Sequence, residues 1–321
     1  MFRREALVVA AQRQCLGGLQ RLARFLGKLF QVHGFLVAQF LLYYTHMGNI
    51  ARPCKAIALA SFILLAASAA RAQVPVLEPF DHKLRYDVYW NNIPLGRIRL
   101  EGKEDSFGYT VTADTKTRGI VRMFDATQSV ITATGRIAEP DEENALTQKT
   151  FYAHRYDSTS TNEDEVKTTT LRYGEDGVLT KVKRNPPDDP ANRPPVPLEQ
   201  ASKGLDPLTA MLALRYRLRD NIALNERKTV MRSYDGARLA DFTFTVVSRA
   251  QMEVMDAHRE AINVVMTRTP IAGYKAKELK KYKEGDPTVH VFFSADAAFI
   301  PLGAEIKLRF GSISVKLTEM E

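Results

Sequence analysis

Cysteine is missing from most of this 321-residue chain, since Cys15 and Cys54 are its only two and both precede residue 73. Residues 73–321 therefore form no disulfide and carry no thiolate nucleophile or cysteine-bound metal. The chain also lacks a GxSxG nucleophile elbow and an HExxH zinc motif. We expect no catalytic residues that a motif would identify, no bound metal and no cofactor.

Histidine is scarce too, with four scattered residues after position 72. One of them, His154, stands near Tyr156 and Asp157 and could seat a metal or act as a base, but such a set is common on a solvated strand. Acidic clusters lack the alternating spacing of a calcium loop, so we interpret them as solvated surface. Paired carboxylates distant in the chain stay possible, because only the fold brings them together. The clusters are Asp141-Glu142-Glu143, Glu163-Asp164-Glu165 and Asp188-Asp189.

Excess charge is also missing after residue 72. The whole chain carries +8, but residues 1–72 hold nine basic side chains and one acid, which leaves 36 of each sign in residues 73–321. A balanced domain without a recognised binding motif does not predict a nucleic-acid partner.

A long hydrophobic run of membrane-spanning length is absent from residues 47–72. The apolar run Ala56–Ala70 has 15 residues, fewer than the roughly 20 that cross a bilayer as a helix. Basic residues precede it and small residues follow it, as in a secretory signal peptide. We expect cleavage between Ala72 and Gln73 and a periplasmic product without a permanent membrane anchor; the alternative is an uncleaved anchor or a buried helix.

A signal peptide that begins 46 residues into a chain is unusual. Met47 stands where a natural start would lie, so we interpret residues 1–46 as an over-extended N-terminus. The competing interpretation is a genuine amphipathic leader that associates with membranes. A peptide mapped within residues 1–46 of the precursor would contradict the first interpretation.

Short segments with period-two alternation dominate residues 73–321, which we expect to form a single β-rich domain. In Leu84–Trp90, for example, every second residue is Leu, Tyr, Val or Trp, so these side chains share one face of a strand, and Asn91–Pro94 provides a turn. So many strands predict an antiparallel meander that curls into a barrel, half-barrel or roll. The candidate strands are 84–90, 96–103, 107–115, 127–137, 147–157, 166–173, 178–184, 228–234, 238–248, 257–268, 288–294, 302–310 and 313–317.

Six prolines in residues 185–197 interrupt this series and predict a long surface loop or, alternatively, a domain linker. A helix is expected over residues 206–219, with Asp206 as its N-cap and Pro207 in its first turn. Because its first half is apolar on nearly every side, it should plug the curled sheet; the alternative is a movable lid. Gly119–Phe124 is expected to form one short helical turn.

The segment Tyr274–Lys283, YKAKELKKYK, contains five lysines and one acid, Glu278. One interpretation is a solvated loop or helix between two strands. The other is contact with anionic lipid headgroups or an acidic polymer of the envelope.

Several strings resemble an exported bacterial family known as domain of unknown function 3108. They are YDVYWNNIPLGRIRL at residues 86–100, a strand ending in Gly135, DPLTAMLALR at 206–215 and VHVFFSADAAFIPLGAEIKLRFGSISVKL at 289–317. The resemblance covers about residues 80–319 and departs at Phe292-Phe293, where the family often has tryptophan. It implies a β-rich envelope protein with a signal peptide and implies no catalytic residues.

For function, we expect a non-catalytic binding or scaffolding protein of the envelope. Aromatic residues predicted to face inward, namely Tyr86, Trp90, Phe107, Phe242 and Phe244, could enclose an apolar, lipid-like ligand, or they could simply fill the core. Two further possibilities are an enzyme acting on an envelope polymer through unaligned carboxylates and an assembly factor that contacts partners through residues 185–197. The ligand-binding residues stay unknown.

Overall fold

The computed structural model describes residues 77–119, 122, 126–138, 150–223, 227–285, 287–308 and 311–321. The predicted cleavage site at Ala72 and Gln73 lies outside these residues. The helices are α3 (Leu198–Ala201), α4 (Pro207–Ala223) and α5 (Ala276–Glu284). The strands are β1 (His82–Trp90), β2 (Ile93–Glu104), β3 (Gly108–Thr117), β4 (Gln128–Ala138), β5 (Thr150–Thr161), β6 (Val166–Tyr173), β7 (Leu179–Asn185), β8 (Lys228–Tyr234), β9 (Leu239–Val254), β10 (Ala257–Ala272), β11 (Val289–Ser294), β12 (Pro301–Leu308) and β13 (Gly311–Met320).

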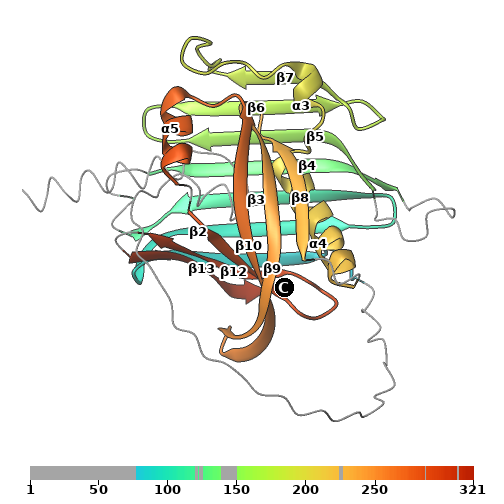
Figure 1. Ribbon diagram of the computed structural model, residues 1–321, viewed down its shortest axis with the longest axis vertical. Helices are drawn as coiled ribbons and strands as arrows, with labels where there is room; N and C mark the ends of the chain where they lie inside the picture. Colours follow the sequence, from blue (N-terminus) through green and yellow to red (C-terminus); the bar gives the residue numbers. More distant parts are fainter. Residues whose placement is uncertain are drawn as a thin grey trace, which may run out of the picture.

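These thirteen strands form one antiparallel sheet and correspond to the thirteen segments predicted from alternation, so the predicted β class is confirmed. Within the first seven strands each pairs with the next along the chain, and the same holds within the last six. The two series join where β1 pairs with β13, for example through Val88 and Val315. Figure 1 shows β2–β7 stacked across the molecule and β8–β10 crossing in front of them.

The curl does not close into a barrel, because β7 and β8 are the two edges of the sheet and are not paired with each other. The segment after β7 partly bridges the gap. Leu205 donates its N–H to the carbonyl of Arg232 on β8 (3.1 Å), and its own carbonyl accepts from Tyr234 N–H (2.9 Å). The β8–β9 turn also reaches β6: a Cβ at Gly236 (φ 91°) would lie 2.3 Å from the methyl group of Thr169.

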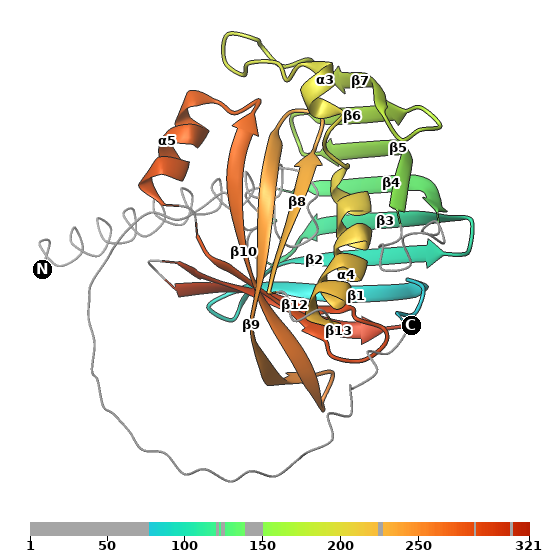
Figure 2. The ribbon, with the colours of Figure 1, turned by 45° about the vertical axis from the view of Figure 1, so that its right-hand side comes forward.

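Helix α4 plugs the curl, as predicted. It contacts β8 on one side and β3, β4 and β5 on the other, an arrangement visible in Figure 2. Its residues from Pro207 to Tyr216 are all buried. The helix forms part of the core on every side, which agrees with its nearly continuous apolar sequence.

Phe107 contradicts the predicted pattern. It was expected to face inward with Tyr109, but it is 83% exposed. The strand begins only at Gly108, and Phe107 belongs to the preceding turn, where Asp105 Oδ1 accepts from the N–H groups of Phe107 (2.8 Å) and Gly108 (2.9 Å). Period-two alternation does not apply to a residue within a turn.

Two other predicted features are modified or only partly described. The proline-rich segment is followed directly by the short helix α3, for which Pro197 is the N-cap, and the strands on both sides belong to the same sheet. The predicted turn Gly119–Phe124 lies largely outside the described residues.

Candidate functional site

The aromatic interior is packed as a core. Tyr86, Phe242 and Phe244 are buried within one continuous apolar cluster, and Trp90 packs against that cluster with part of its surface exposed. The Tyr86 hydroxyl donates to the carbonyl of Pro301 (2.7 Å), which satisfies the one polar atom of that side chain. Leucines of α4 occupy the space that the sheet encloses. The packing favours the core-filling role of these aromatic residues over a ligand cavity.

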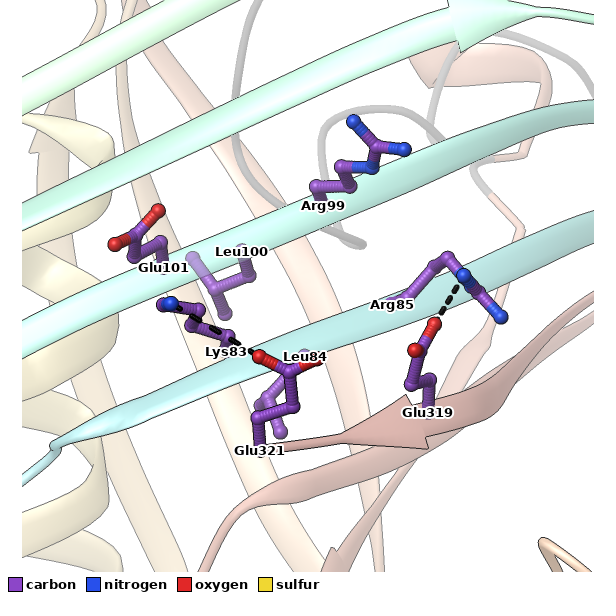
Figure 3. A pocket seen from close by; sticks show the side chains of 8 residues that line it. All are labelled: Lys83, Leu84, Arg85, Arg99, Leu100, Glu101, Glu319 and Glu321. Carbon is purple, nitrogen blue, oxygen red and sulfur yellow. Dashed lines mark ion pairs between the residues drawn. The ribbon is translucent and has the colours of Figure 1, made fainter.

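A hollow of about 220 Å³ lies on the outer face of β1, β2 and β13 (Figure 3). Four of its six charged side chains form two ion pairs: Lys83 Nζ lies 3.9 Å from Glu321 Oε2, and Arg85 pairs with Glu319. Ligand pockets of drug-sized molecules are mostly apolar and start at about 300 Å³. This hollow is smaller, and six of its eight lining side chains are charged. Its lining residues are Lys83, Leu84, Arg85, Arg99, Leu100, Glu101, Glu319 and Glu321.

Buried carboxylates are the groups most capable of acid–base chemistry here. Four occur in the described part of the chain, namely Glu104, Asp206, Asp235 and Glu278. Burial penalises a bare charge strongly, so each must either meet donors or bind a proton. Their partners decide whether any of them is available for a substrate.

Asp206 caps α4, as predicted. Its carboxylate accepts from the N–H groups of Leu208 (3.1 Å) and Thr209 (3.0 Å) and from the Thr209 hydroxyl (2.6 Å). The Tyr109 and Thr209 hydroxyls are hydrogen-bonded at 2.7 Å. Complete burial raises the pKa of Asp206 to about 6, against the lowering effect of these hydrogen bonds. Every contact serves to fix the start of the helix on β3.

Glu104 anchors the middle of α4. Its carboxylate accepts from Phe80 N–H (3.0 Å) and from the Tyr216 hydroxyl, and Arg215 Nη1 lies 3.7 Å away. Arg215 has no exposed side-chain surface. Its guanidinium also donates to carbonyls on two other segments, those of Glu78 (3.3 Å) and Phe299 (3.3 Å). One buried ion pair thus connects α4 to β2 and to the segments before β1 and β12.

Asp235 and Glu278 share Arg238. The Asp235 carboxylate accepts from Arg238 Nε (3.0 Å) and from the N–H groups of Ala237 (2.8 Å) and Arg238 (2.7 Å). Arg238 Nη1 lies 3.9 Å from Glu278 Oε1, which also accepts from Arg193 Nη2 (3.1 Å). Arg193 in turn donates to the carbonyl of Gly273 (2.5 Å). This network ties the proline-rich segment, the β8–β9 turn and α5 together.

All four carboxylates therefore have their own protein donors and serve to hold helices or turns on the sheet. Burial acts to raise the pKa of Glu278, but Arg238 and Arg193 outweigh it and hold the pKa below its usual value. No residue pattern could have revealed the Arg193–Glu278 contact, since the two lie 85 positions apart. The Asp206 cap was detectable because its signal is local.

The weaker candidates are not assembled into a site. His154 is the extra residue of a β-bulge on β5, because Gly135 pairs with Ala153 and Thr134 with Arg155. Its neighbour Tyr156 is buried, whereas His154 is exposed. Within the described ranges, no three His, Cys, Asp or Glu side chains gather as metal ligands. The cluster at 141–143 lies outside those ranges.

The lysine-rich segment forms α5, which settles the choice between loop and helix. Glu278 is its only buried residue. Lys277, Lys280, Lys281 and Lys283 are all exposed. The helix is therefore a surface element that carries most of its charge into solvent.

A family model described as "Protein of unknown function (DUF3108)" matches residues 85–318. No curated protein matches the chain. Among solved structures, a beta-barrel-like protein of domain of unknown function DUF1849 from Brucella abortus has a TM-score of 0.46 and 13% identity, covering 77% of this chain and 98% of its own.

Two further structures each have a TM-score of 0.31, 9% identity and 77% coverage of this chain. One, described as a "putative lipoprotein", is from Parabacteroides distasonis and is covered over 97% of its length. The other, a "putative exported protein" with a YmcC-like fold from Bacteroides fragilis, is covered over 98%. Among the described residues, no helix is both long and apolar enough to span a bilayer.

Proposed function

Because the chain belongs to the DUF3108 family, whose function is unknown, we propose from its own geometry that it is an exported, non-catalytic binding or scaffolding protein of the cell envelope. We propose further that it meets its partner on its outer surface. The export half of the proposal rests on the leader at residues 47–72.

The observation that carries the binding role is the occupation of the interior. Helix α4 fills the curl, and the four buried carboxylates are each matched by protein donors. An enzyme needs a general acid or base within reach of its substrate. Glu104, Asp206, Asp235 and Glu278 instead hold the fold together, so none of the buried carboxylates of the described residues supports the polymer-cleaving alternative.

Binding of an apolar, lipid-like ligand inside the curl stays a separate prediction. It requires α4 to leave its place or the aromatic core to open, which would expose Phe242 and Phe244 to a lipid chain. A leucine-rich helix buried on all sides stabilises the closed form, because moving it would return a large apolar surface to water.

Native mass spectrometry of the mature protein, purified from its own periplasm without detergent, tests this function. We expect the mass of the polypeptide alone and an N-terminus at Gln73. A small molecule retained in nearly equimolar amount after extraction would overturn the filled interior. An N-terminus upstream of residue 47 would overturn the proposed export route.

A further inference from the structure

Helix α5 lies at the outside of the molecule, beside one end of β10, in both ribbon views (Figures 1 and 2). It is joined to the body mainly through Glu278, whose carboxylate accepts from Arg193 and from the N–H of Lys275 (2.8 Å). Arg193 also donates a hydrogen bond to the carbonyl of Gly273, just before the helix. The start of α5 is therefore held both at Gly273 and at Glu278. The anchor fixes which face of α5 points outward.

The outward face combines cations with an exposed apolar side chain. At about 100° per residue, Lys280 and Lys283 lie on the side opposite Glu278, and Lys277 and Leu279 lie on its two flanks. The Lys280 side chain is 78% exposed, and Leu279 is 38% exposed. Ile271, at the end of β10 just before the helix, is also exposed.

Positive charge accumulates here without a matching number of free acids. The charge of Glu278 is shared by Arg193 and Arg238, and Glu284 faces Lys280 only at 3.9 Å. Partial burial lowers the pKa of Lys275, and the nearby charges of Arg193, Lys277 and Lys167 lower it further. Crowded cations favour an anionic partner, which would relieve their repulsion.

We propose that α5 docks the protein on an anionic lipid surface, with Lys277, Lys280 and Lys283 at the headgroups and Leu279 entering the interface. This inference rests on the proposed outer-surface function. A short cationic helix with an apolar flank matches the mixed character of an anionic bilayer interface, where each lysine near the surface adds attraction. A fully hydrated acidic polymer would make no use of Leu279 and Ile271.

The contact is peripheral and reversible. One leucine in a nine-residue helix gives too little apolar burial for stable insertion, so electrostatic attraction supplies most of the affinity and salt weakens it. The anchored orientation lowers the entropy cost of docking, because the lysines are already on one side.

The test measures binding of the mature chain, residues 73–321, to phosphatidylcholine vesicles with and without phosphatidylglycerol. We expect binding only to the anionic vesicles, with a loss of at least tenfold between low and physiological salt. The triple variant Lys277→Gln/Lys280→Gln/Lys283→Gln should weaken binding by about 100-fold at low salt, and Leu279→Gln by a few-fold.

The matched control is Lys103→Gln/Lys181→Gln/Lys183→Gln, which removes three exposed lysines from β2 and β7 and should bind almost as the parent does. Equal losses in both triple variants would overturn the role of α5. Binding to a soluble acidic polysaccharide but not to vesicles would overturn the lipid partner. If a small molecule is retained and vesicle binding still depends on α5, only the proposal of a filled interior is overturned. If no small molecule is retained and the protein does not bind vesicles, only the docking proposal is overturned.

Discussion

Helices α4 and α5 are held to the same sheet by the same kind of contact, yet they have opposite surroundings. A buried carboxylate meets arginine in both cases: Glu104 with Arg215 in α4, and Glu278 with Arg193 in α5. The first ten residues of α4, Pro207–Tyr216, are all buried, whereas α5 buries only its glutamate. The ion pair of α4 therefore lies within the core, whereas the ion pair of α5 holds a helix whose other side chains reach solvent or are only partly buried.

Breaking the α4 pair should have the largest effect. Arg215→Met leaves Glu104 buried without its cation. It also leaves the carbonyls of Glu78, Ala298 and Phe299 without this donor, so we expect the free energy of unfolding to fall by about 3–5 kcal/mol. Arg219→Met removes the arginine of a partly exposed ion pair in the C-terminal half of α4 and should cost about 1 kcal/mol or less. Urea denaturation measures both.

The double variant Glu104→Gln/Arg215→Met sharpens this prediction. It removes the unpaired charge, so it should recover a substantial part of the stability that Arg215→Met loses. A double variant as unstable as the single one would show that the arginine acts only through its carbonyl contacts.

Truncating one leucine in each helix compares their packing directly. Leu212 has no exposed surface, so Leu212→Ala should lower the free energy of unfolding by about 2–5 kcal/mol. Leu279→Ala in α5 should change it by about 0.5 kcal/mol or less, because that side chain already contacts water. Similar losses at the two positions would contradict the view of α5 as a surface helix.

The α4 cap should make stability depend on pH. Burial raises the pKa of Asp206 to about 6 from its ordinary value of 3.8, so between these values the folded state binds more protons than the unfolded state. The contribution of Asp206 to stability therefore falls as pH rises from about 4 to about 6, by about 2–3 kcal/mol. Asp206→Asn keeps a good N-cap and should remove this slope, which denaturation at several pH values would detect.

The α5 anchor should respond to pH in the opposite direction and by less. Arg238 and Arg193 hold the pKa of Glu278 below its ordinary value of 4.5 in spite of burial. Its stabilisation is therefore present above pH 4.5 and is lost as pH falls through the folded pKa. Hydrogen exchange should show Glu278→Gln loosening α5 while the protection of α4 stays unchanged. Equal loosening of both helices would mean that the anchor supports the whole fold.

Local patterns were enough to identify the strands and helix α4, but they did not predict α3 and left α5 open between loop and helix. Alternation marked all thirteen strands, and the Asp206-Pro207 start marked α4, because side-chain direction and capping depend on neighbours within a few residues. The same reasoning misplaced Phe107, whose turn conformation depends on the Asp105 side chain. The leader predictions concern residues outside the described ranges and stay predictions.

The arrangement of those elements depended on the fold. The pairing of β1 with β13, the approach of the β8–β9 turn to Thr169 and the meeting of Arg193, Arg238 and Glu278 join residues tens to hundreds of positions apart. Such contacts form only when the sheet curls, and no local spacing encodes them. Composition and periodicity thus determined a β-rich chain with one apolar helix and with no cysteine in residues 73–321. The curl of the sheet decided which charges became buried anchors and which lysines stayed in water.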